Sequence, residues 1–107
     1  MPVLVYGCGP LTSLFLRAIE LLPRADLRVV GIIDDVGDRC GRYLNNALVL
    51  GHARDLERVL IDLAVQGVHP AKLIVTCSPG EVTEEARAAM EFARLHHGLL
   101  IDYLPAV

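Results

Sequence analysis

Tryptophan is absent from this sequence, lysine occurs once, and no apolar run approaches the length of a membrane span. A spanning helix needs about 18 consecutive apolar residues, and the N-terminal residues lack the basic, apolar and cleavage regions of a signal peptide. The three cysteines are odd in number and show no Cys-x-x-Cys spacing, so we expect neither a disulfide framework nor a zinc site. We therefore expect a cytoplasmic protein.

An excess of positive charge is missing as well. Ten basic and thirteen acidic residues give a net charge of -3 and are scattered along the chain, which leaves no basic patch for nucleic acid. The hydrophobic fraction is nevertheless 53% in 107 residues, so the apolar side chains are expected to form an interior. One domain usually has about 100 to 150 residues. We expect residues 1–107 to form a single domain.

Short apolar runs alternate with helical patterns along the whole chain. The runs, rich in Val, Ile and Leu, cover residues 3–6, 27–33, 47–50, 73–77 and 99–101, as strands buried on both faces do. Apolar residues at helical spacing occupy residues 11–22, 56–63 and 86–93, whereas residues 34–46 resemble a long loop. This alternation predicts an α/β, Rossmann-like, doubly wound parallel sheet of five strands in the order 3-2-1-4-5, with helices on both faces.

Two glycines that follow the first predicted strand are the first candidate ligand-binding residues. In a dinucleotide-binding Gly-x-Gly-x-x-Gly loop, the first glycine permits the turn, the second admits the phosphates, and the third lets helix and strand pack closely. Gly7 and Gly9 fill the first two places, but Thr12 stands in the third. We expect Thr12 to shift the first helix and weaken binding, so that Thr12→Gly would tighten it. Pro10 fits a first helical turn but removes one amide donor.

Two acidic residues end the second predicted strand. Asp34 lies a little beyond the offset of about 20 residues at which an acidic residue contacts an adenosine ribose. Asp34 is therefore the candidate ribose ligand, with Asp35 next, although acidic residues also end strands as solvated turn residues. Arg42, in the following loop, is a candidate for a phosphate or sugar contact, with simple surface exposure as the alternative.

The fourth predicted strand runs into a turn of small residues. In the predicted strand order its C-terminal end lies beside that of the first strand, where the topology switches direction and ligands bind. Thr76 and Ser78 are thus placed to line the crevice, while Ser78 also fits the start of a capping box for the last helix. The predicted cofactor-binding residues are Gly7, Cys8, Gly9, Pro10, Leu11, Asp34, Asp35, Arg42, Thr76 and Ser78.

Successive blocks of the sequence resemble one known family of domains. These blocks are residues 4–9, 29–35, 41–42 with 49–51 and 55–56, 73–78 and 98–105. They are similar to the Rossmann-like, CoA-binding-type domain of bacterial polysaccharide-biosynthesis proteins, which precedes the catalytic domain of membrane-associated nucleotide-sugar 4,6-dehydratases. A similar domain occurs in polyprenyl-phosphate sugar-phosphate transferases. The resemblance implies that residues 1–107 are a single nucleotide-binding accessory domain, a fragment of a larger protein, that partners the catalytic domain of a parent dehydratase or epimerase-type enzyme. It also implies that any membrane is met only through other parts of that parent protein.

Catalysis by this chain alone is not expected. Dehydratase chemistry of the short-chain type needs Tyr-x-x-x-Lys, and the single lysine, Lys72, has no such tyrosine. A serine-hydrolase elbow and an NTPase phosphate loop are also missing from the sequence. Metal binding by His96 and His97 is not expected, and Cys8 and Cys77 are interpreted as packing residues, with an oxidisable thiol pair as the alternative.

Two classes of function remain. In the first, the domain binds NAD(H) or a nucleotide sugar and serves a larger saccharide-modifying enzyme. In the second it has lost its ligand and acts as a scaffold, forming a homodimer through an exposed apolar helix face or holding the catalytic domain. A small redox or acyl-CoA sensor is a third alternative.

Overall fold

The computed structural model describes residues 1–7, 9–21, 26–36 and 40–104. Cys8, one of the predicted site residues, lies outside the described residues, as does the predicted end of the first helix. The elements in chain order are β1 (Pro2–Tyr6), α1 (Pro10–Leu21), β2 (Arg28–Ile33), β3 (Tyr43–Leu44), β4 (Ala47–Gly51), the 3-10 turn η1 (Ala53–Asp55), α2 (Leu56–Val65), β5 (Lys72–Val75), the 3-10 turn η2 (Pro79–Glu81), α3 (Glu84–His97) and β6 (Leu100–Tyr103).

The described strands form one sheet in the order β3-β4-β2-β1-β5-β6. Five of them, β4, β2, β1, β5 and β6, are parallel and follow the order predicted from the sequence. The prediction of a purely parallel, five-stranded sheet was wrong, because β3 adds a sixth strand antiparallel to β4. The physical reason is a tight hairpin: Asn45 and Asn46 both have positive φ, 46° and 67°, as a two-residue turn of the I′ kind requires.

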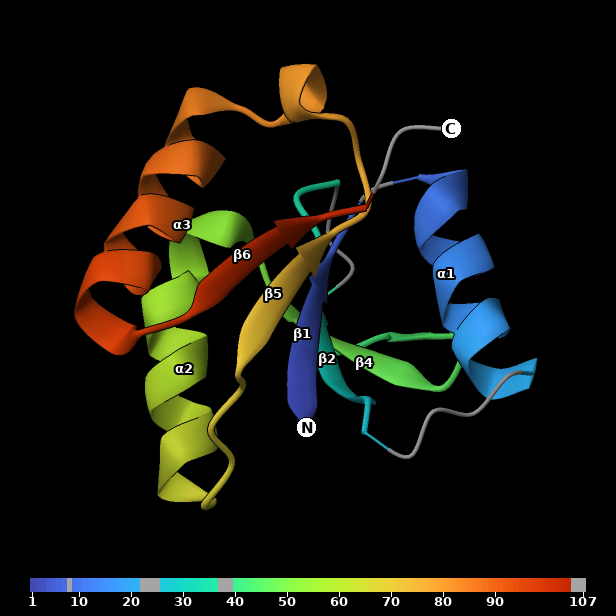
Figure 1. Ribbon diagram of the computed structural model, residues 1–107, viewed down its shortest axis with the longest axis horizontal. Helices are drawn as coiled ribbons and strands as arrows, with labels where there is room; N and C mark the ends of the chain where they lie inside the picture. The colour runs from blue at the N-terminus through green and yellow to red at the C-terminus, as the bar shows by residue number, and fades with distance from the viewer. Residues whose placement is uncertain (8, 22–25, 37–39, 105–107) are drawn as a thin grey trace.

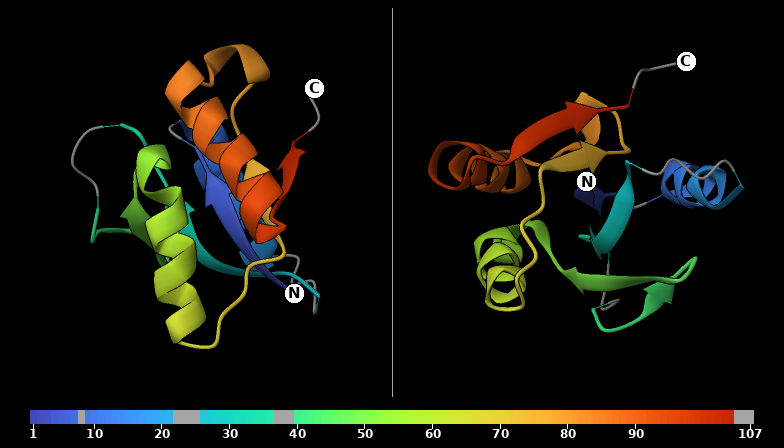
Figure 2. Two further views of the ribbon diagram at one scale, coloured as in Figure 1. Left: turned by 90° about the vertical axis from the view of Figure 1, so that its left-hand side faces the viewer. Right: turned by 60° about the horizontal axis from the view of Figure 1, so that its bottom comes forward.

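Helices cover both faces of the sheet, as predicted, and Figure 2 shows α1 on one side and α2 with α3 on the other. Under α1, Leu16 packs on Val5, Ile32 and Val49, and Phe15 lies against the same cluster. The larger cluster lies beneath α2 and α3. It gathers fifteen buried residues, including Leu4, Tyr6, Ile33, Leu56, Leu60, Leu73, Val75, Ala86 and Met90. Successive strand residues point to opposite faces, so residues that adjoin in sequence serve different layers.

The last helix begins later than the proposed capping box. Ser78 instead precedes the η2 turn, where its hydroxyl donates to Glu81 Oε1 at 2.8 Å. The N-cap of α3 is Thr83, whose Oγ1 accepts from the Ala86 amide at 3.1 Å. At the other end Gly98 adopts the left-handed conformation at φ 67°, which side-chain-bearing residues disfavour. In the part of the chain that the structure describes, no helix is both long and apolar enough to cross a bilayer.

Candidate functional site

The carboxyl ends of β1, β2 and β5 are held in register at one edge of the sheet. The Gly7 amide donates to the Ile33 carbonyl at 3.1 Å, and the Thr76 amide donates to the Tyr6 carbonyl at 2.8 Å. Asp34 is fixed in the same way, since its amide donates to the Gly51 carbonyl at 3.0 Å. Figure 1 shows β5 and β6 pointing toward the end of the sheet at which α1 begins. This edge is the topological switch point at which open α/β sheets bind ligands.

Gly7 is the tightest point of this edge. A Cβ added to it would lie 1.9 Å from Thr12 Oγ1 and 2.0 Å from Thr76 Oγ1, so neither alanine nor any larger residue fits without displacing both threonines. The first glycine of the motif is therefore required by its neighbours. Because Gly7 has no side chain, the hydroxyls of Thr12 on α1 and Thr76 after β5 can meet beside it.

Thr12 occupies the place of the third glycine in a specific way. It is 1% exposed, and its hydroxyl oxygen lies 2.7 Å from that of Thr76. The Thr76 hydroxyl donates to the Tyr6 carbonyl at 2.8 Å. Because a hydroxyl has a single proton to donate, Thr76 accepts in its contact with Thr12, and Thr12 is the donor. A hydroxyl chain thus joins α1 to the ends of β5 and β1, where a glycine would leave only close packing.

Gly9 differs from Gly7 in having open space around it. An added Cβ would meet nothing within 4 Å. Gly9 and Pro10 are exposed, and Leu11 is 49% exposed. The Gly9 carbonyl accepts from the Thr12 amide at 3.1 Å, and the first turn of α1 carries no acidic residue. A helix N-terminus has partial positive charge and unpaired amides, so this open backbone can be approached by an anion.

The two acidic residues after β2 have different environments. Asp34 is 1% exposed, and its Oδ1 accepts from the Val36 amide at 2.9 Å, which fixes the turn that follows the strand. Asp35 is half-buried; its Oδ2 accepts from the Tyr6 hydroxyl at 2.5 Å and its Oδ1 from the Ala53 amide at 2.7 Å. Asp35 therefore joins β1 to the η1 turn at the end of β4. This contact connects the strand ends and was not anticipated from the sequence.

Arg42 and Ser78 lie at the surface. Arg42 is exposed beside the β3–β4 hairpin, where its carbonyl accepts from the Val49 amide at 2.8 Å. Ser78 is exposed, with its side chain engaged by Glu81. Among the described residues, Gly7, Thr12 and Thr76 are in direct contact with one another, whereas Arg42 and Ser78 lie apart from them at the surface.

Sequence reasoning missed Tyr6 as a participant, and it missed the hydrogen bond of Thr12 to Thr76. The available signal for Tyr6 was its place directly before the first glycine of the motif.

Two of the histidines and Cys77 make contacts with neighbouring elements or side chains. Within the described ranges of the chain, no group of three or more His, Cys, Asp or Glu side chains could hold a metal ion. His97 Nε2 lies 3.2 Å from Glu57 Oε2, which joins α3 to α2, and His96 stacks on Phe92 with ring centroids 4.2 Å apart. Cys77 packs against the larger core cluster, as predicted for a packing residue. The alternative thiol pair with Cys8 falls outside the described residues.

Of three comparisons with known proteins, only the one with solved structures found a match. No protein-family model and no curated protein matches the chain. Among solved structures, the chain is similar to the crystal structure of RSP, a Rex-family repressor, with a TM-score of 0.64 and 12% sequence identity. The match covers 96% of this chain and 52% of the repressor chain, so this chain spans about half the length of that protein. At this identity the similarity shows the fold, which is α/β and Rossmann-like.

Proposed function

We propose that this chain is a non-catalytic domain that binds a nucleotide, NAD(H) or a nucleotide sugar, at the edge formed by β1, β2 and β5. The observation that carries the proposal is the contrast between two glycines of one loop. Gly7 is required by the packing of Thr12 and Thr76, whereas nothing in the packing requires Gly9 to lack a side chain. A glycine without a packing role, placed before the first turn of a helix, suits close approach of a phosphate to the backbone.

The loop supplies electrostatic attraction for such a phosphate. The start of α1 contributes amide groups and the positive end of the helix dipole, and no acidic side chain in the first turn opposes an anion. Pro10 contributes no amide, and the Thr12 amide is held by the Gly9 carbonyl. The proposed phosphate contacts are therefore made by the backbone between Gly7 and Leu11, with Cys8 among the residues of that segment.

Asp34 and Thr76 border the proposed site and support it differently. The Asp34 carboxylate holds the turn after β2 through the Val36 amide, and a ribose hydroxyl would bind it by replacing that amide. A carboxylate in this position favours a ribose with free hydroxyls over a 2′-phosphate, since two anionic groups repel each other. Thr76 acts through Thr12, because its hydroxyl keeps the first turn of α1 against the strand ends.

The larger protein that we propose is a saccharide-modifying enzyme of the dehydratase or epimerase type, in which this domain partners a catalytic domain. The support is the block-by-block resemblance described above together with the Rossmann-like fold. The domain would present the nucleotide part of a ligand, while proton and hydride transfers take place elsewhere, since the single lysine, Lys72, has no tyrosine four residues before it. Sequencing of the native reading frame on both sides of this segment tests this part.

Ligand binding is tested by native mass spectrometry of the purified protein, followed by calorimetry with NAD, NADH, UDP-glucose and CoA. The expected result is saturable binding of a dinucleotide or a UDP-sugar. Tight binding of CoA alone would favour the acyl-CoA sensor alternative. No heat with any ligand, in a sample shown to be folded, would contradict the nucleotide proposal.

A second candidate function, a homodimeric scaffold, is favoured by one feature of α1. Leu11, Leu14 and Leu21 are 49%, 66% and 72% exposed, and with Ala18 they follow a three-four-three spacing along one side of the helix. Such a spacing is typical of a seam between two helices. Sedimentation equilibrium tests it: a dimer that Leu14→Glu converts to a monomer would support the scaffold, and a monomer at high concentration would refute it.

A further inference from the structure

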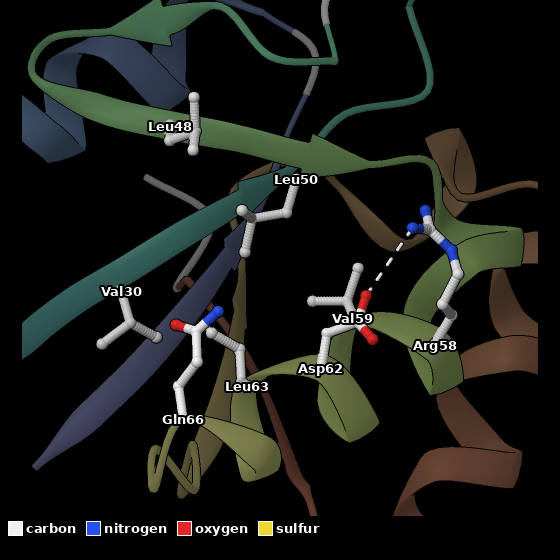
Figure 3. Close-up of a pocket in the computed structure, with 8 residues that line it drawn as sticks. All are labelled: Val30, Leu48, Leu50, Arg58, Val59, Asp62, Leu63 and Gln66. Carbon is white, nitrogen blue, oxygen red and sulfur yellow. Dashed lines mark ion pairs between the residues drawn. The ribbon is translucent and has the colours of Figure 1, made fainter.

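A pocket lies on the sheet face covered by α2, opposite to the face that α1 covers. Its volume is about 300 Å³, and five of its eight lining residues are aliphatic (Figure 3). Val30 of β2 and Leu48 and Leu50 of β4 form the sheet side, and Val59 and Leu63 of α2 form the helix side. Ligand pockets of proteins usually have volumes of about 300 to 1,000 Å³ with mostly apolar linings. This pocket is at the small end of that range.

The mouth of the pocket carries charge of both signs. Arg58 and Asp62 lie at its edge, with Gln66 at the end of α2 (Figure 3). The Arg58 guanidinium is 3.8 Å from Asp62 Oδ2 and 3.7 Å from Asp55 Oδ2. Both distances exceed the 2.7 to 3.2 Å of an N–H···O hydrogen bond. The Arg58 and Asp62 side chains are 58% and 62% exposed, so both can turn toward a ligand.

The charged side chains at the mouth of the pocket bear on which ligand charges can bind there. Asp55, Arg58 and Asp62 place one positive charge between two negative ones, so a simple anion meets two carboxylates and a simple cation meets the guanidinium. A zwitterion offsets these costs because each of its charges has a partner: its carboxylate can pair with Arg58 while its ammonium pairs with Asp62. Arg suits the carboxylate because its planar fork of donors matches two oxygens.

We propose that this pocket binds a free α-amino acid with a branched aliphatic side chain. The α-carboxylate pairs with Arg58 and the α-ammonium with Asp62, while the aliphatic side chain enters the space between β4 and α2. The size of the pocket admits one such side chain, as a cavity of about 150 Å³ already holds a benzene ring. The proposal is independent of nucleotide binding, because none of the residues that line the pocket lies at the carboxyl ends of β1, β2 and β5, where the nucleotide is proposed to bind.

The test is an NMR titration of the ¹⁵N-labelled protein, without nucleotide, using four probes. L-leucine carries both charges, N-acetyl-leucine lacks the ammonium, leucinamide lacks the carboxylate, and alanine lacks the branched side chain. L-leucine is expected to give saturable shifts in amides of β4 and α2, with at least tenfold weaker binding for each of the other three. Equal binding of leucine and N-acetyl-leucine would overturn the proposal, as would the absence of saturable shifts.

Substitutions of the two charged residues at the mouth give a second test. The same NMR spectra show whether each variant is folded. Arg58→Gln and Asp62→Asn are each expected to weaken leucine binding at least tenfold. Arg17→Gln, at an exposed position on α1, is the matched control and is expected to leave binding unchanged. Unchanged binding in both mouth variants would overturn the assignment. Shifts that grow with protein concentration alone would also overturn it, because they would identify the occupant as a second copy of the chain.

Discussion

Replacing Thr12 by glycine, which restores the usual third glycine of the motif, is predicted to destabilise the protein. Thr12 is 1% exposed and donates to Thr76, so the change removes a buried hydrogen bond and a buried methyl group. It also puts glycine inside α1. A net hydrogen bond contributes about 0.5–1.5 kcal/mol, a buried methyl group about 0.8 kcal/mol, and a helical glycine costs up to about 1 kcal/mol relative to alanine. Thr12→Gly should therefore lower the free energy of unfolding by about 2–3 kcal/mol.

Two further variants separate the contributions of the Thr12 hydroxyl and the Thr12 methyl group to the free energy of unfolding. Thr12→Val keeps the shape and removes the donor, which should cost about 1–2 kcal/mol because Thr76 loses its partner. Thr12→Ser keeps the donor and removes the methyl group, at a cost of about 1 kcal/mol. In a double-mutant cycle with Thr76→Val, the coupling energy should be about 0.5–1.5 kcal/mol, in the range of one hydrogen bond.

The assay is urea unfolding followed by circular dichroism, with thermal unfolding as a second measurement. A loss of about 2–3 kcal/mol corresponds to a fall in Tm on the order of 10–20 °C for a domain of this size. A Thr12→Gly protein as stable as the wild type would refute the hydroxyl chain as a stabilising contact. That result would also restore the simpler view from the sequence, in which Thr12 only obstructs the packing of helix on strand.

Three further predictions concern contacts outside the loop. Tyr6→Phe removes the hydroxyl that donates to Asp35, and should cost about 2 kcal/mol in urea unfolding because the acceptor is a half-buried carboxylate; a loss below the measurement error would contradict it. Gly98→Ala places a side chain at φ 67° in open space, so only backbone conformation opposes it, and unfolding should show a loss of about 1 kcal/mol. The hydrogen bond from Arg94 lowers the pKa of Glu91 below its ordinary value; its small contribution to stability is present above the unfolded pKa and is lost as pH falls through the lowered pKa. An NMR titration should show the pKa of Glu91 rise in Arg94→Gln, and no change would contradict the pairing.

The sheet shows what could be predicted from the sequence and what could not. The order of the five parallel strands followed from their alternation with helices and from the right-handed crossover rule. The sixth strand was missed because β3 has only two residues and lies in a stretch that is polar and charged. The pair Asn45-Asn46 was the available signal, since Asn tolerates positive φ and such pairs form tight hairpin turns.

The sequence predicts which residues lie together at the carboxyl ends of the strands, but it does not predict their side-chain contacts. The motif and the strand order together place Gly7, Asp34 and Thr76 at one edge, because parallel strands end on the same side. The sequence could not show that Thr12 and Thr76 share a hydrogen bond, since they are 64 positions apart. The separate roles of Asp34 and Asp35 depend on their neighbours: Asp34 accepts from Val36 in its own turn, whereas Asp35 accepts from Tyr6 of β1 and Ala53 of η1.

The central claim, that the loop after β1 binds a phosphate through its backbone at Gly9, is tested most directly by calorimetry on Gly9→Val. Nothing lies within 4 Å of an added Cβ, and the Gly9 backbone does not lie in the left-handed region that favours glycine, so stability should change by less than about 0.5 kcal/mol. The account predicts that wild type binds NADH or UDP-glucose and that folded Gly9→Val loses at least tenfold in affinity. Equal affinity of both proteins would contradict it.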